Sequence, residues 1–333
     1  MLRIHFRRED LGRTRLATGP EPMWEMILSL HKLADGQGRL VFDGWRRRVL
    51  ATLPTPLRWL LHLAPPVGYS PDFLTPATEA SDLETGLDLV LTAPRRTIRG
   101  DLATLGAQQA LHGPVLDLAD GSAQALGTLG QAMREYHAHA IAPFWDRISA
   151  RVHAEITALG RTLMHSGIEA LLTTLHPEAR WNPPVLELPY GRNHEVHLQG
   201  RGLRLLPSFF CWKTPFTFYD TDLAPVLAFP IEHDLNWLAP SSRRDPRRPL
   251  SALLGRTRTT VLTALSAPGG CTTTELARRT GISLASASQH AGVLREAGLI
   301  STVRRGGHVV HSLRPAGRSL INAPGRAAPH QTT

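Results

Sequence analysis

A closely spaced series of helix-start and helix-stop residues in the last quarter of the chain constrains its fold more than any other feature. Thr272 precedes Glu275 by three positions, which is the capping-box arrangement at a helix N-terminus. Gly281 is placed to end this short helix, Ser283 to cap a second one, and Gly298 to follow the end of the second. Two short helices joined by a glycine-containing turn form a helix-turn-helix.

The segments on either side extend this motif into a larger unit. Residues 250–266 have the apolar spacing of an amphipathic helix, which Pro268 and two glycines close. Residues 299–313 form two alternating segments around Gly306-Gly307, and paired glycines supply the positive φ of a tight hairpin turn. We therefore predict a winged helix-turn-helix over residues 250–322. The apolar side of its first helix consists of Leu250, Leu253, Leu254, Val261, Leu262 and Leu265.

Positive charge is concentrated in this part of the chain. Residues 243–333 contain 14 arginines, no lysine and three acidic residues, a net charge of +11, whereas residues 1–242 carry −2. A general coding bias explains why the chain has 35 arginines and only two lysines, but it does not explain why acidic residues are scarce in one segment. All 20 aromatic residues precede Pro240. The basic segment therefore has no platform for stacking bases, and double-stranded DNA is its expected partner.

The second helix of the motif is expected to enter the major groove of DNA with its front half. Gln289 can pair with adenine through two hydrogen bonds. Thr272 and Thr273 lie at a helix start, where backbone N–H groups can bind a phosphate. Arg304 and Arg305 at the tip of the wing can reach a phosphate or the minor groove. The predicted DNA-binding residues are Thr272, Thr273, Ser283, Ser286, Ser288, Gln289, His290, Arg295, Arg304 and Arg305.

Some polar side chains of this helix are expected to face the protein or to bond within the helix instead. The residues concerned belong to the set Ser286, Ser288, Gln289 and His290. Three apolar residues at the end of the helix and just beyond it are expected to belong to the core: Val293, Leu294 and Leu299.

Residues 272–313 resemble the ArsR-like family of bacterial winged-helix regulators. The segments Ser288–His290 and Val293–Leu299 carry the resemblance, because they match the recognition helix of that family and its exit into the wing. The resemblance implies a homodimer on a pseudo-palindromic operator. The chain departs from the family at Leu284, which replaces a commonly polar side chain, and at Ala291, where a packing leucine is usual. Gly292 adds a glycine inside the helix. The metal-sensing cysteine motif of the founding members is absent.

A proline- and arginine-rich segment separates the winged helix from the rest of the chain. We therefore predict an N-terminal domain over residues 1–240, a linker over 241–249 and, after the winged helix, a disordered tail over 323–333. The N-terminal domain resembles the long regions of unassigned function that precede some ArsR-like winged helices. It is expected to mediate dimerisation, effector sensing or both.

The N-terminal domain has the mixed patterns of an α+β fold that is mainly helical. Alternation over residues 2–7 predicts a strand, and Pro22 opens a helix that is predicted to run to Leu33. Further helices are predicted over 122–140 and 143–163. Apolar runs between turn residues predict a small antiparallel sheet or meander. These runs are Val185–Leu188, Glu195–Leu198, Leu203–Phe210 and Val226–Phe229.

The predicted helix over residues 143–163 carries the longest apolar stripe of the chain. We predict that it supplies the two-fold contact of a homodimer. Such a contact would hold two recognition helices about 34 Å apart, which is the spacing of successive major-groove turns. The alternative, which the sequence leaves open, is that the stripe belongs to the internal core.

Several side chains of the N-terminal domain suggest sites that the sequence does not complete. His194 and His197 would point to opposite faces of a strand, and Tyr136–His139 is an incomplete ligand set, so no metal site is predicted. Cys211 is expected to be a buried structural thiol. Four aromatic residues line a ligand pocket or pack in the core, and both possibilities stay open: Trp212, Phe216, Phe218 and Tyr219.

The sequence contains no P-loop, dinucleotide-binding glycine motif or nucleophile elbow. We therefore expect no enzyme activity and no cofactor, and no cofactor-binding residues are assigned. The charged N-terminus is unlike a signal peptide, and no apolar run is long enough for a membrane span, so a cytoplasmic protein without a membrane partner is expected.

The function predicted from these features is a sequence-specific, double-stranded DNA-binding regulator of transcription. It is expected to be a repressor that acts as a homodimer and responds to a small-molecule effector in its N-terminal domain. Two alternatives remain, an enzyme or a protein-docking scaffold, each with the winged helix as an accessory module.

Overall fold

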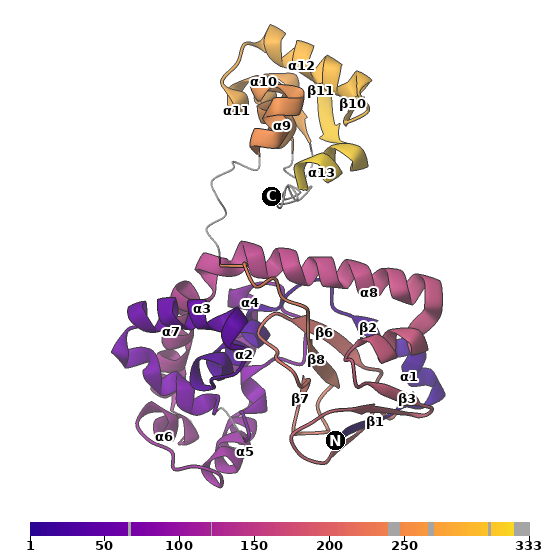
Figure 1. Cartoon of the computed structure of the whole chain (residues 1–333). Coiled ribbons are helices and arrows are strands. Elements are labelled where there is room, and N and C mark those ends of the chain that lie inside the picture. The colour runs from indigo at the N-terminus through magenta and orange to yellow at the C-terminus, as the bar shows by residue number, and fades with distance from the viewer. Residues whose placement is uncertain (66–67, 121, 239–246, 266–269, 306–307, 323–333) are drawn as a thin grey trace, which may run out of the picture. The chain divides into compact units, whose positions relative to one another are not determined.

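The chain divides into two compact units, the N-terminal unit Met1–Leu238 and the C-terminal unit Ala239–Thr333. Each unit is described by itself on a computed structural model (Figure 1). No helix among the described residues has both the length and the apolar character needed to cross a membrane. The structure describes residues 1–65, 68–120, 122–238, 247–265, 270–305 and 308–322.

Helices make up most of the N-terminal unit. The predicted helix that begins at Pro22 is confirmed as α2, and Ser122 caps α7 by accepting a hydrogen bond from the Ala125 N–H. The α-helices are α1 (Arg8–Arg13), α2 (Pro22–Ala34), α3 (Arg39–Thr52), α4 (Leu83–Leu91), α5 (Arg95–Gly106), α6 (Pro114–Ala119), α7 (Ala123–Ala140) and α8 (Trp145–Thr174). The 3-10 helices are η1 (Thr55–Leu63), η2 (Asp72–Leu74) and η3 (Ala142–Phe144).

The strands of this unit form two four-stranded sheets, with the orders β3-β4-β1-β5 and β2-β6-β8-β7. The α+β prediction is confirmed, but the expected single antiparallel sheet is replaced by two mixed sheets. The reason is that β1 and β2 come from the N-terminus and pair in parallel with β5 and β6. The strands are β1 (Leu2–His5), β2 (Arg15–Leu16), β3 (Arg180–Asn182), β4 (Val185–Leu188), β5 (His194–His197), β6 (Arg204–Ser208), β7 (Phe216–Thr217) and β8 (Val226–Pro230).

The sheet that contains β8 is buried on both faces. Val226 and Ala228 belong to the cluster formed with the helices, whereas Leu227 and Phe229 belong to the cluster formed with the other sheet. Successive side chains of a strand point to opposite faces, so an unbroken apolar run is what a strand between two cores requires.

Helix α8 runs along both of these clusters (Figure 1). Ile148 and Val152 are fully buried against the helices, and Leu159 is 4% exposed against the sheet. The central residues of the apolar stripe predicted over residues 143–163 are therefore internal core, whereas Trp145, Ile156 and Leu163 are only partly buried. The dimer contact expected of this helix stays a prediction.

The C-terminal unit contains the predicted winged-helix elements, one additional strand, β9, and one additional helix, α13. Its helices are α9 (Arg247–Leu254), α10 (Arg256–Ala264), α11 (Thr273–Thr280), α12 (Leu284–Glu296) and α13 (Pro315–Asn322). Its strands are β9 (Cys271–Thr272), β10 (Ile300–Arg305) and β11 (His308–Leu313), in the sheet order β10-β11-β9. The wing is the antiparallel pair of β10 and β11. The Gly306-Gly307 turn and the tail over residues 323–333 lie outside the described residues.

Two predicted boundaries in this unit are wrong. The single helix expected over residues 250–266 is broken at Gly255, whose φ of +82° is not helical. The break takes Leu253 out of the core, and this side chain is 70% exposed. The linker expected to reach residue 249 ends earlier, because α9 begins at Arg247 and a proline is tolerated in a first helical turn.

Candidate nucleic-acid interface

Side-chain caps fix the two helices of the motif where the sequence predicts them. The Thr272 hydroxyl accepts a hydrogen bond from the Glu275 N–H at 3.2 Å, and Ser283 accepts one from the Ser286 N–H at 3.2 Å. Gly281, with a φ of +68°, ends α11 in the left-handed conformation. The turn between α11 and α12 is therefore set by local hydrogen bonds, and the Thr272 and Ser283 side chains serve first as caps.

One side of α12 packs against the core of the C-terminal unit. Ala287, Ala291 and Leu294 follow at spacings of four and three, and each is at most 1% exposed. Leu294 and Ala291 contact the cluster that also contains Leu276 and Val261. The small side chain of Ala291 therefore allows the neighbouring helices to approach α12 closely.

The opposite side of α12 is open to solvent. Ser288 and Gln289 are exposed, whereas Ser286 and His290 are half-buried at the flanks. Val293 is 39% exposed, so its prediction as a core residue is wrong, whereas Leu294 and Leu299 are buried as predicted. The buried stripe of α12 passes through Ala287, Ala291 and Leu294, and at 100° per residue position 293 lies on another side of the helix. Two of the predicted base-contacting side chains, Ser288 and Gln289, are thus directly available.

A surface hollow connects the starts of α11 and α12 with the wing strand β11. It brings together three predicted DNA-binding residues, Thr272, Thr273 and Ser288. Leu284, which is 54% exposed, lines the same hollow and adds an apolar side chain at the front of α12. The complete lining is Thr272, Thr273, Thr274, Leu284, Ala285, Ser288 and Val309.

His311 on β11 joins the wing to α11 and is a residue that the sequence analysis missed. Its Nε2 lies 3.0 Å from the Thr273 hydroxyl and its Nδ1 2.9 Å from the Thr302 hydroxyl, so both ring nitrogens are hydrogen-bonded. The side chain is buried, and burial, with a smaller effect of the Arg295 charge, lowers its pKa. This buried, neutral imidazole is hydrogen-bonded at both nitrogens and holds α11 against the two wing strands. The pairing of β9 with β11 places it there, and this pairing is not visible in the local pattern.

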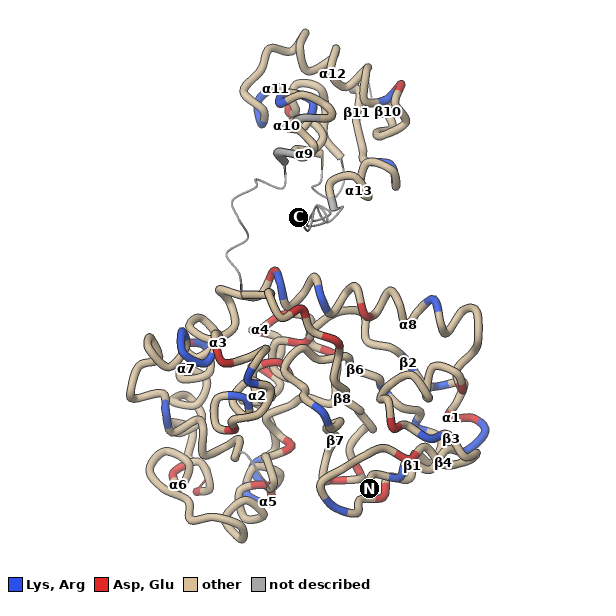
Figure 2. The backbone as a smooth tube through the Cα atoms, in the orientation of Figure 1, with Lys and Arg blue, Asp and Glu red and all other residues tan. Residues whose placement is uncertain are grey.

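The charged residues of the C-terminal unit are mainly arginines (Figure 2). Arg295 near the end of α12 is exposed, whereas Arg279 forms an ion pair with Glu275 on α11. The backbone of Arg304 and Arg305 belongs to β10, but their side chains lie outside the described part of the chain. Their contact with DNA stays a prediction.

The N-terminal unit contains a cavity of about 410 Å³. Trp212 and Phe216 line it, together with Lys32 and Arg192, whereas Phe218 is buried in the core. The Nε1 atom of Trp212 is buried and has no hydrogen-bond partner among the described residues. Cys211 also borders the cavity, and burial raises the pKa of its thiol far above the ordinary value, as expected for a structural cysteine.

Comparison with known protein families identifies one part of the chain. A family model described as a helix-turn-helix domain matches residues 253–303, which extend from α9 into β10. No curated protein matches the chain, and no solved structure matches it. A helix-turn-helix domain is typical of proteins that bind DNA and regulate transcription. The match therefore points to DNA binding by the C-terminal unit, and the N-terminal unit lies outside it.

Proposed function

We propose that this chain is a sequence-specific, double-stranded DNA-binding regulator of transcription that acts as a homodimer and represses by occupying its operator. The proposal makes it a regulator and not an enzyme. The exposed face of α12 is the observation that carries it. This face presents Ser288 and Gln289 beside the hollow at the start of α11, on a unit whose sequence has a net charge of +11 from residue 243 onward.

The residues around the hollow suggest how bases are read. Gln289 can form a bidentate pair with adenine, and the Leu284 side chain can contact a thymine methyl group. Ala285 and Ser288 are small, so the front of α12 can approach the base edges closely. The starts of α11 and α12 carry the positive ends of their helix dipoles, which favour a phosphate nearby.

A dimer is proposed because one recognition helix reads only a half-site, and two helices about 34 Å apart read a pseudo-palindrome. Ile148, Val152 and Leu159 of α8 are buried within one chain, so we place the proposed contact elsewhere. Leu253 on α9 is 70% exposed and is our candidate for it. Sedimentation of the full chain should show a dimer that Leu253→Ser weakens. Leu40→Ser, which changes an exposed leucine of α3, should leave the dimer intact. Equal masses for all three proteins would remove Leu253 from the contact.

The cavity of the N-terminal unit is the proposed effector site. Trp212 and Phe216 favour an apolar ligand, and the unpartnered Nε1 donor of Trp212 favours a hydrogen-bond acceptor on it. Binding of a small organic molecule of this kind would be coupled to DNA affinity by typically about 1–3 kcal/mol.

The salt dependence of duplex binding tests the proposal as a whole. Each phosphate contact contributes about −0.9 to the slope of log K against log salt concentration. The double variant Arg304→Ala with Arg305→Ala should weaken binding to all duplexes and flatten the slope by up to about 2. The matched control is Arg95→Ala with Arg96→Ala, an exposed arginine pair on α5 of the N-terminal unit.

The outcomes of this experiment are distinct. A flatter slope for the wing variant alone supports duplex binding through the winged helix. Identical slopes for the wild type and the wing variant would remove the wing from the interface. Absence of duplex binding by the wild-type protein at low salt would overturn the proposed function.

A further inference from the structure

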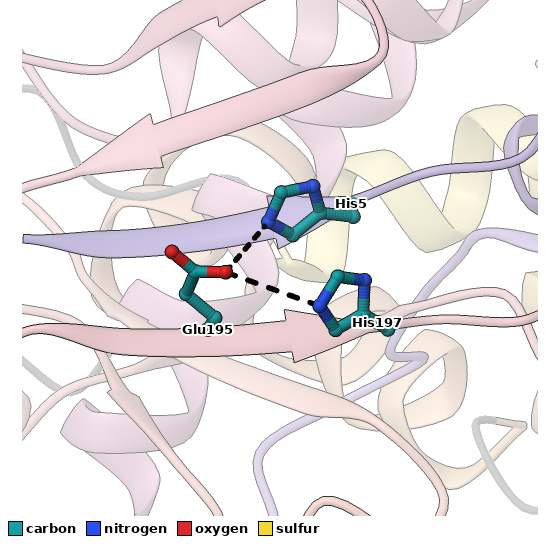
Figure 3. Close-up of side chains that lie close together, drawn as sticks. All are labelled: His5, Glu195 and His197. Carbon is teal, nitrogen blue, oxygen red and sulfur yellow. Dashed lines mark ion pairs between the residues drawn. The ribbon is translucent and has the colours of Figure 1, made fainter.

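Two histidines and a glutamate meet on one face of the sheet β3-β4-β1-β5. Strands β1 and β5 are parallel neighbours, with His5 opposite His197 and Arg3 opposite Glu195. Because side chains two positions apart share a face, Glu195 and His197 point to the same side as His5. The Oε2 atom of Glu195 lies 3.4 Å from Nε2 of His5 and 3.9 Å from Nε2 of His197 (Figure 3).

The hydrogen bonding of this cluster is incomplete. Nε2 of His5 is buried and has no hydrogen-bond partner among the described residues. An unsatisfied buried polar atom is unusual in a folded protein. The other carboxylate oxygen of Glu195, Oε1, faces Nη1 of Arg3 at 3.6 Å. Oε2 therefore faces the two imidazoles, and this oxygen lies close to the Nε2 atoms of His5 and His197.

We propose that His5, Glu195 and His197 bind one divalent transition-metal ion, with Zn²⁺ as the best match. Their candidate ligand atoms lie within 4.8 Å of one another. Two imidazole nitrogens and one carboxylate oxygen suit Zn²⁺, whereas Ca²⁺ and Mg²⁺ prefer oxygen ligands alone. The ion supplies the partner that His5 lacks, and Arg3 orients the carboxylate from the other side.

The side chains have the freedom that ligation requires. Zn–N and Zn–O distances are about 2.0–2.2 Å, so the ligand atoms must move closer together around the ion. The Glu195 and His197 side chains are 52% and 58% exposed and can rotate. Ligation would turn the imidazoles out of their present stack, in which the ring centroids are 4.2 Å apart. The exposure also leaves a fourth position for water.

The site would act on the fold of the N-terminal unit. Strand β5 is the edge strand of its sheet, and β1 is its neighbour. An ion shared by His5 and the two β5 ligands would tie the edge strand to the chain's N-terminal strand. Zn²⁺ should therefore raise the unfolding temperature of the N-terminal unit, since a ligand that binds only the folded state stabilises it.

The test uses the full chain without a histidine tag, stripped with a chelator and titrated with Zn²⁺ against a chromophoric chelator near pH 7.5. We expect one ion per chain. His5→Gln, His197→Gln and Glu195→Gln should each weaken binding at least about 10-fold, as losses at metal sites typically do. The matched control is His194→Gln on the same strand, because the Nε2 of His194 is bonded to the Phe218 carbonyl.

A thermal-unfolding readout and a second variant complete the experiment. Tryptophan fluorescence reports unfolding of the N-terminal unit, which contains all seven tryptophans, and Zn²⁺ should raise its midpoint in the wild type and the control but not in the ligand variants. Should His5→Gln fail to fold, His197→Gln tests the same site from an exposed position. No bound ion, or equal binding by the wild type and His197→Gln, would overturn the proposal. Equal loss in His194→Gln would also overturn it.

Discussion

The N-terminal unit buries charged side chains, whereas the described part of the C-terminal unit keeps its charges at the surface. Glu25 is 1% exposed and accepts hydrogen bonds from two backbone N–H groups and a serine hydroxyl of the segment around β6. Lys32 and Arg46 are also buried, and both contact Asp35. Asp35 pairs with both cations, whereas Glu25, whose pKa is raised to about 7 by burial, is held by uncharged donors of a distant segment. These contacts help to specify how the unit packs.

The described part of the C-terminal unit buries no charged side chain. Among its described residues, the buried polar side chains are uncharged groups, Thr259 and the imidazole of His311. Its core is aliphatic, and no ring of Phe, Tyr or Trp belongs to it. The difference teaches that the arginines described in the C-terminal unit lie at its surface, where all except Arg279, which pairs with Glu275, remain available to a polyanion.

The largest effect should come from a core tryptophan of the N-terminal unit, and it tests whether the two units are independent. Trp45 is fully buried, packs on Phe210 and donates to the Ala140 carbonyl. Trp45→Ala should cost about 3–5 kcal/mol of the unit's free energy of unfolding. Denaturant unfolding followed by the fluorescence of the remaining tryptophans measures this loss. Leu40→Ala, at an exposed position of the same helix, is the control.

Duplex-DNA binding by the Trp45→Ala protein completes this test. The C-terminal unit has its own core, so binding at low salt should persist in the destabilised protein. Loss of DNA binding in parallel with the fluorescence transition would show that the two units fold as one. The two units could then not be treated as independent.

A glycine of the C-terminal unit should give the next largest effect. A Cβ atom at Gly317 on α13 would lie 2.2 Å from the Leu299 carbonyl oxygen. Gly317→Ala therefore forces α13 away from the wing, and we expect a loss of about 1–3 kcal/mol. The part of the circular-dichroism transition that does not coincide with the tryptophan fluorescence transition reports this unit and should shift, whereas the tryptophan signal of the other unit should stay unchanged. Ser319→Ala, exposed on the same helix, should have little effect. A shift of the tryptophan fluorescence transition would show that Gly317→Ala also destabilises the N-terminal unit, which would contradict the independence of the two units.

The N-terminal and C-terminal units also differ in which features the sequence predicts correctly. In the C-terminal unit the decisive signals are local, since Thr272 and Ser283 cap helices that begin one residue later. The failures there are also local in origin. Gly255 breaks a helix that an apolar pattern alone makes continuous, and Val293 lies beside the stripe and not on it.

In the N-terminal unit the sequence predicted three of the helices, α2, α7 and α8, but neither the other helices nor the pairing of strands. Strand β1 pairs with β4 and β5, which lie more than half the chain away. Alternation shows that a strand exists and which side is buried, but it carries no information on its partner. The meeting of His5 with Glu195 depends on that pairing. As predicted, His194 and His197 do not share a site, because His194 bonds to the Phe218 carbonyl whereas His197 faces Glu195. The third proposed ligand, His5, comes from the N-terminal strand β1.

At the interface itself, Gln289→Ala should change sequence preference more than general affinity. Base-edge contacts specify sequence, whereas phosphate contacts position the protein. We expect a loss of about 1–3 kcal/mol at one or two base pairs. Selection of bound fragments from a random duplex pool gives the preference profile. The Arg304→Ala, Arg305→Ala double variant should weaken binding to all DNA sequences alike. An unchanged profile would mean that the exposed face of α12 does not read bases through Gln289.

A smaller effect, of opposite sign, is expected from Gly292 within α12. A Cβ atom there meets nothing within 4 Å, and its backbone is helical. Gly292→Ala should therefore stabilise the C-terminal unit by about 0.5–1 kcal/mol, because glycine is costly inside a helix. Gly298→Ala is the control, since that position is equally open but has a φ of +72° and should be destabilised. Stabilisation by both substitutions would contradict the backbone assignment. If Gly292→Ala weakens duplex binding while raising stability, this part of α12 approaches DNA closely.

The smallest effect concerns His311, a buried histidine that bonds α11 to the wing, and it tests whether the C-terminal unit tolerates a buried charge. Its pKa in the folded protein is lowered, mainly by burial, from an ordinary value of about 6.5. The unfolded chain therefore binds a proton more readily, so the stabilising effect of neutral His311 is complete above about pH 6.5 and is lost as the pH falls below it. Denaturant unfolding of the C-terminal unit between pH 8 and pH 5 measures this loss. His311→Gln, which cannot titrate, should flatten the dependence. If both proteins lose stability equally on acidification, another group is responsible. A weaker pH dependence of the unfolding free energy in His311→Gln would show that a buried charge at this position destabilises the C-terminal unit.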